Sequence, residues 1–225
     1  QRGLLGNPEA DHQRQNLLIM KSIPEYASVS KLIADVSKLC IENGVTFRMH
    51  NGSKVYLGNR MYSSGFFSSD PSSLELAVST GVKDESWLMV LVHESCHLDQ
   101  WMEDRSVFDG MDNSASLDEW LNGKRFRKSS IDKAIDAIVK IELDCEKRSV
   151  KKIKKYNLPL DTKRYTSMAN TYMYFYYWIK KSRVWVPRNK SLYIEEIIKH
   201  SPKRFQKDYS EIPLKLEDAF NKYLK

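Results

Sequence analysis

Residues 88–98 of the chain read LMVLVHESCHL, an apolar run that contains the pentad His93-Glu94-Ser95-Cys96-His97. We expect this run to be helical, and side chains four positions apart on a helix project from the same face. His93 and His97 can therefore hold one metal ion, while Glu94 can reach its open side and take a proton from a water. The alternative is that two His and one Glu meet by chance on an amphipathic helix.

Size and composition suit one full domain or a domain with a small extension. The chain has 225 residues, of which 41% are hydrophobic, enough for a sizeable core. No apolar stretch approaches the ~20 residues of a membrane span, and the first residues lack a secretory pattern. The three cysteines, Cys40, Cys96 and Cys145, are too few and too widely spaced for a disulfide framework. We therefore expect an intracellular, cytoplasmic protein that does not enter a membrane.

The net charge is +7, and much of the excess lies in two basic segments, residues 124–128 and 147–155. Such segments can dock nucleic acid, but they can equally form a solvated helix face. The sequence holds no motif that reads bases, so nucleic acid is a possible partner only.

Residues 1–19 lack periodicity and are expected to be a leader or arm, of native or added origin. Three-and-four spacing of apolar residues predicts a helix over residues 26–43, with Gly44 in the stop position. Alternation then predicts a strand over 45–50, a hairpin turn at Asn51-Gly52 and a return strand over 54–58. A loop over 63–73 and a third strand over 74–79 should precede the pentad helix, which Asp84 or Ser86 caps.

The second half of the chain is expected to be helical. Residues 109–122 are polar and indicate turns, whereas residues 131–156 have the spacing of a long helix that Pro159 closes. Further helices are predicted over 165–181, 191–200 and 214–224, with a short extended piece over 184–186. The fold class is α+β, with a core over residues 20–158 and a helical, aromatic and basic extension over 159–225 packed on that core.

A catalytic zinc needs three protein ligands and an open position. The best source of the third is IELDCEKR, residues 141–148, because Glu142 and Glu146 share one face of the long helix. Two carboxylates on the core side of a helix are costly unless a positive charge lies against them, and zinc supplies one. The alternatives are an acidic face paired with nearby basic residues, or Glu103 as the third ligand.

Two helices that carry HExxH and Glu-x-Asp-Cys-Glu resemble the gluzincin group of zinc metallopeptidases, especially its ImmA/IrrE-type and HtpX-like members. The resemblance covers residues 26–156 and implies a zincin-like fold, in which a small, mostly antiparallel sheet packs on the HExxH helix and the second helix. It also implies that Glu142 is the third zinc ligand and that Glu146 supports the site. The chain departs from the pattern at Asp99, Cys145 and Glu146.

These features predict a zinc-dependent metallopeptidase that hydrolyses peptide bonds in a protein or peptide substrate, with Glu94 as the general base. The residues considered as oxyanion donors are His50, Tyr172, Tyr176 and His200. An extended substrate can add to an edge strand made by Leu74, Leu76 and Val78. Cys96 and Cys145 are expected to be small buried residues where the two helices approach closely.

Two other functions fit the same residues. One is a nucleic-acid-associated protease of SprT-like type that docks through its basic helix. The other is a catalytically silent zincin-fold protein that binds a partner or has a structural role; the presence of Glu94 argues against it, since a scaffold needs no general base. The sequence fixes neither the substrate nor the oligomeric state.

Overall fold

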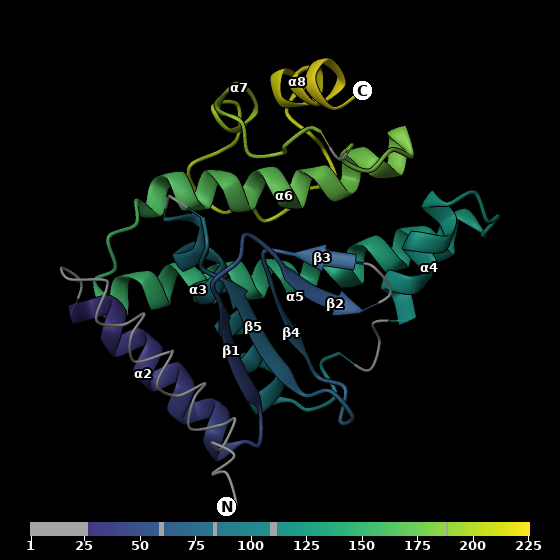
Figure 1. Ribbon diagram of the computed structural model, residues 1–225. Coiled ribbons are helices and arrows are strands. Elements are labelled where there is room, and N and C mark those ends of the chain that lie inside the picture. The colour runs from purple at the N-terminus through teal and green to yellow at the C-terminus, as the bar shows by residue number, and fades with distance from the viewer. Residues whose placement is uncertain (1–26, 59–60, 83–84, 109–111, 188) are drawn as a thin grey trace, which may run out of the picture. The chain divides into compact units, whose positions relative to one another are not determined.

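The computed structural model describes residues 27–58, 61–82, 85–108, 112–187 and 189–225 (Figure 1). Within these residues, seven helices and five strands confirm an α+β protein. The chain forms two compact units: the first runs to Val90 and includes Tyr156–Leu158, and the second comprises Leu91–Lys155 and Pro159–Lys225. The predicted leader, Tyr26 and Asp84 lie outside the described residues.

The first unit begins with α2 (Ala27–Glu42), whose apolar stripe is buried as predicted. Gly44, two residues after the end of the helix, has a positive φ of 69°. The next amide, that of Val45, donates to the carbonyl of Cys40 at 2.8 Å. This left-handed backbone conformation after a helix C-terminus favours glycine, so the predicted helix end is confirmed.

The sheet of the first unit differs from the prediction. Strands β1 (Thr46–His50), β5 (Glu75–Ser79) and β4 (Gly65–Ser68) lie in the order β1-β5-β4, with β1 parallel and β4 antiparallel to β5. Strands β2 (Val55–Gly58) and β3 (Met61–Ser63) form a separate antiparallel pair. The main sheet is thus mixed, and the segment predicted as a loop over 63–73 contains β4.

The predicted Asn51-Gly52 hairpin is wrong. After β1, the chain stays beside the continuation of β5: the Thr80 amide donates to the His50 carbonyl at 2.7 Å and the Gly81 amide to the Gly52 carbonyl at 2.9 Å. A Cβ atom at Gly81 would lie 2.4 Å from the Asn51 carbonyl oxygen, so glycine is needed for this close approach. The turn residues therefore serve a parallel pairing that the local sequence does not signal.

The second unit is built on helices. Helix α3 (Ser86–Glu103) continues from the first unit into it and carries the pentad. Helices α5 (Lys128–Tyr156) and α6 (Thr162–Ser182) run side by side in opposite directions (Figure 1). Lys180 pairs with Asp132 at 2.8 Å, and the Tyr177 hydroxyl donates to Asp136 at 3.0 Å. Both long helices confirm the sequence prediction.

The shorter helices of this unit are α4 (Asp112–Leu121), α7 (Glu195–Ile198) and α8 (Leu214–Leu224). Helix α4 occupies the segment predicted as turns. The helix predicted over residues 191–200 is present only as the four residues of α7. Residues 184–186 form no strand, whereas α8 has the predicted bounds. Apolar residues of α5, α6 and α8 share one buried core that includes Ile135, Phe175, Trp178 and Phe220. None of the described helices combines the length and apolarity that a membrane crossing requires.

Candidate metal centre

His93 and His97 lie on one face of α3, where helical spacing brings their Nε2 atoms to 3.1 Å from each other. The Glu142 carboxylate on α5 faces both rings, with Oε2 3.5 Å from His93 Nε2 and Oε1 3.7 Å from His97 Nε2. Donors around a tetrahedral ion at about 2.0–2.1 Å lie roughly 3.3–3.4 Å apart. The three side chains that the sequence singled out as ligands are therefore brought together at spacings that suit one metal ion.

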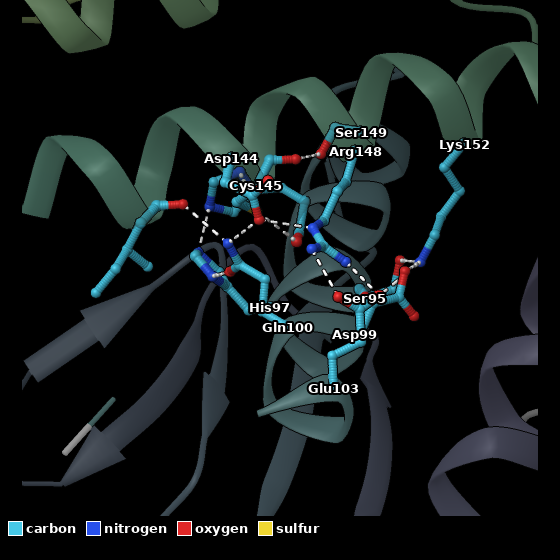
Figure 2. Close-up of polar contacts among 12 residues, drawn as sticks. Ser95, His97, Asp99, Gln100, Glu103, Asp144, Cys145, Arg148, Ser149 and Lys152 are labelled. Carbon is cyan, nitrogen blue, oxygen red and sulfur yellow. Dashed lines mark hydrogen bonds and ion pairs between the residues drawn. The ribbon is translucent and has the colours of Figure 1, made fainter. Parts of the chain in front are cut away.

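The ring of His97 is oriented by Gln100 (Figure 2). Gln100 Nε2 donates to the Ile141 carbonyl at 3.0 Å and to Asp144 Oδ2 at 2.8 Å, which fixes the amide with its oxygen on the other side. That oxygen lies 2.9 Å from His97 Nδ1, so Nδ1 carries the proton and donates. His97 Nε2 is then left as an acceptor.

The ring of His93 is oriented in the same sense by Glu146, whose Oε1 lies 3.3 Å from His93 Nδ1. A carboxylate at this distance holds a proton on Nδ1 and leaves Nε2 as the acceptor. Two imidazole acceptors at 3.1 Å repel each other unless a proton or a cation lies between them. The contacts around both rings thus favour a cation at the point where the two Nε2 atoms meet.

The carboxylates of the cluster have unused oxygens. Among the described residues, Glu142 Oε2 and Glu146 Oε2 are buried without a hydrogen-bond partner. Burial raises the pKa of Glu142 to about 7, the nearby Glu146 adds to the rise, and His93 opposes it. An ionised carboxylate is costly in such surroundings, and a bound cation would offset that cost.

The two histidines respond differently to their surroundings. Burial and then the charge of His93 lower the pKa of His97 to about 4, so His97 is neutral near pH 7. Burial opposes a charge on His93 as well, but Cys145 and Glu146 outweigh it and raise the pKa of His93 well above its usual value. The surroundings of His93 therefore favour its charged form, whereas those of His97 favour the neutral form.

Cys145 is an alternative to Glu142 as the third ligand. Its sulfur, His93 and His97 can be grouped within 4.8 Å. However, Cys145 Sγ lies on the Nδ1 side of His93, at 3.7 Å, and donates to the His93 carbonyl at 3.3 Å. Glu142 faces both Nε2 atoms, so we favour Glu142. Cys96 and Cys145 are free and buried, which confirms the prediction of small buried residues.

Glu94 lies beside His93 on α3 and is half-buried. Its carboxylate is close enough to His97 to act against the burial that lowers the pKa of that residue. The role of Glu94 as a general base stays a prediction.

The oxyanion candidates divide into two groups. The hydroxyls of Tyr172 and Tyr176 share one hydrogen bond at 2.7 Å. Burial raises the pKa of both residues, and the charge of Glu142 adds to the rise. His50 is exposed at the end of β1 in the first unit, and His200 follows α7. The roles of all four stay predictions.

Tyr193 is a residue that the sequence did not single out. The residue is 42% exposed, yet burial and the charges of Glu146 and Glu142 raise the pKa of Tyr193, while the charge of His93 opposes the rise. It lies just before α7, far along the chain from either motif. No local pattern signals such a position.

Two site predictions are wrong. Leu74, Leu76 and Val78 were expected on an edge strand, but β5 is the central strand of its sheet and both of its edges are paired. Glu103, the alternative ligand, directs both carboxylate oxygens at Arg148, at 2.7 and 2.8 Å. A salt bridge on the outer surface therefore takes the place of metal binding there.

The basic segment of α5 is only partly free for a partner. Arg148 binds Glu103 and Asp144, and Lys152 contacts Asp99 at 2.7 Å and Ser95 Oγ at 2.9 Å (Figure 2). Lys147, Lys151 and Lys154 are exposed. In segment 124–128, Lys124 pairs with Glu119 at 2.6 Å.

A scan against protein-family models finds no family that matches this chain, and searches of curated proteins and of solved structures find no match either.

Proposed function

We propose that the protein is a zinc-dependent metallopeptidase. The observation that supports this best is the convergence of His93 Nε2, His97 Nε2 and the Glu142 carboxylate, at 3.1, 3.5 and 3.7 Å. Two nitrogens and one carboxylate are the ligand set of zinc sites that keep an open position for catalysis. The orientation of each ring by a further residue adds support.

When bound, zinc lowers the pKa of a water and polarises a carbonyl. Glu94 then accepts the proton of the attacking water and returns it to the leaving amine. Glu146 and Gln100 keep the imidazoles oriented, and Tyr172, Tyr176 or Tyr193 can donate to the developing oxyanion. The substrate is a protein or peptide.

Metal analysis of protein purified without chelator tests the proposal. We expect one zinc per chain, lost in His97→Ala, together with cleavage of peptides in a proteome-derived library read by mass spectrometry. His200→Ala is the matched histidine control and should keep its zinc. Wild-type protein that is folded but binds no zinc would contradict the proposal.

A nucleic-acid-associated protease of SprT-like type is the second candidate, and the exposed lysines on α5 favour it. Binding to single-stranded or duplex DNA should then weaken steeply as salt rises. Substituting Lys147, Lys151 and Lys154 together by Gln should reduce the slope of that salt dependence. Equal binding by the variant would remove this candidate and leave the peptidase proposal intact.

A further inference from the structure

Gln100 is a buried amide one helical turn beyond His97 on α3. It is only 4% exposed, and both the oxygen and the nitrogen of its amide have hydrogen-bond partners. The oxygen faces His97 Nδ1 at 2.9 Å, and the nitrogen donates to the Ile141 carbonyl at 3.0 Å and to Asp144 at 2.8 Å (Figure 2). A buried amide with all of these partners has a single orientation.

The partner Asp144 is itself held in place. Arg148 Nε donates to Asp144 Oδ2 at 2.6 Å, and the two terminal nitrogens of Arg148 bind Glu103 at 2.7 and 2.8 Å. Paired hydrogen bonds between guanidinium and carboxylate restrict both groups to one geometry. A chain of contacts therefore runs from the C-terminal turn of α3 through α5 to the ring of His97.

We propose that Gln100 is a positioning residue of the metal centre: it holds the His97 ring with Nδ1–H on the amide oxygen and Nε2 directed at the metal. The inference rests on the proposed zinc site and extends it. Asp144 and Arg148 keep the amide from turning over, because a reversed amide would place its oxygen against the Asp144 carboxylate and the Ile141 carbonyl. Without Gln100 the ring of His97 can rotate away from Glu142.

Gln100→Leu tests this by removing the amide while keeping a side chain of similar size. Groups that orient metal-bound histidines typically contribute about 10- to 100-fold in metal affinity. We expect a loss of that size in the dissociation constant for the zinc ion alone, measured by competition with a chromophoric chelator. The matched control Gln206→Leu removes a glutamine whose amide donates to the Arg204 carbonyl, and it should bind zinc as the wild type does.

A spectroscopic measurement separates positioning from mere packing. In zinc-loaded protein labelled with ¹⁵N-histidine, the His97 Nδ1 proton should be shifted downfield and exchange slowly with solvent. In Gln100→Leu this proton should exchange faster. The other ring protons should change little.

A second variant, Gln100→Met, keeps a long side chain at this position but has no amide. We expect it to weaken zinc binding as Gln100→Leu does, because neither side chain accepts the His97 Nδ1 proton. If Gln100→Leu does not fold, a folded Gln100→Met that binds zinc with wild-type affinity and exchanges the His97 ring proton as slowly as the wild type overturns the inference.

The two proposals fail in different ways. Wild-type protein without zinc defeats the metallopeptidase. Wild-type protein that binds zinc tightly, together with unchanged affinity and ring-proton exchange in Gln100→Leu, overturns the role of Gln100 alone.

Discussion

Glu94 has the most specific chemical role that we assign to a single residue. It follows His93 in the chain and is not one of the three proposed ligands. Glu94→Gln keeps the size of the side chain and removes its basicity. We expect the variant to retain one zinc and to lose peptide cleavage by about 10²- to 10⁴-fold, the usual contribution of a general base.

Zinc content by mass spectrometry and cleavage of the best library peptide check this prediction together. Glu196→Gln, at an exposed position, is the control and should leave both unchanged. Full activity in Glu94→Gln would show that another group accepts the proton.

The pKa of Glu142 predicts how the stability of the metal-free protein depends on pH. Burial raises the pKa of its carboxyl from 4.5 to about 7. Ionisation is therefore less favourable in the folded chain than in the unfolded one, so the stabilising contribution is complete below about pH 4.5 and is lost as pH rises through about 7. Glu142→Gln cannot ionise and should remove this decline, a relative gain on the order of 1–3 kcal/mol at about pH 8.

Urea unfolding with chelator at about pH 5 and about pH 8 measures the difference. The wild type should lose more stability than the variant between these two values, and zinc should no longer bind to the variant. Parallel pH profiles of the two proteins would mean that Glu142 already ionises at its ordinary pKa.

Helix α6 provides a prediction at the scale of elements. Asp161 is its N-cap, and one carboxylate oxygen accepts hydrogen bonds from the amides of Lys163 and Arg164 at 2.8 and 3.2 Å. Asp161→Ala leaves these amides without that acceptor and should cost about 1 kcal/mol of unfolding free energy. Asp218→Ala, at an exposed position within α8, should cost less, and urea unfolding compares the two; equal losses would speak against the cap.

The elements also separate what local sequence predicts from what it misses. Apolar spacing predicted α2, α5, α6 and α8, because a helix buries a face that repeats every three or four residues. The prediction of a hairpin at Asn51-Gly52 was wrong, because these residues lie beside the continuation of β5, a strand much later in the chain. Alternation identifies a strand but carries no information on its neighbour.

At the scale of the whole molecule, every proposed ligand lies in the second unit, although α3 begins in the first. A ligand stabilises the unit that binds it, by about 2.7 kcal/mol at a hundredfold excess over its dissociation constant. We therefore expect zinc to increase hydrogen-exchange protection chiefly in residues 91–155 and 159–225. Mass spectrometry of the exchanged protein checks this, with His97→Ala as the control that should not respond. Equal protection of both units would contradict a site confined to one.

The sequence by itself determined helices α2, α3, α5, α6 and α8, the α+β class and the shared face of His93 and His97, because periodicity and four-residue spacing are local properties. It also indicated Glu142 and Glu146 through the cost of burying carboxylates. Only the tertiary structure decided that Gln100 and Tyr193 lie at the site, that Glu103 binds Arg148, and that β5 is central. These depend on contacts between residues distant in the chain, which packing fixes and no local pattern encodes.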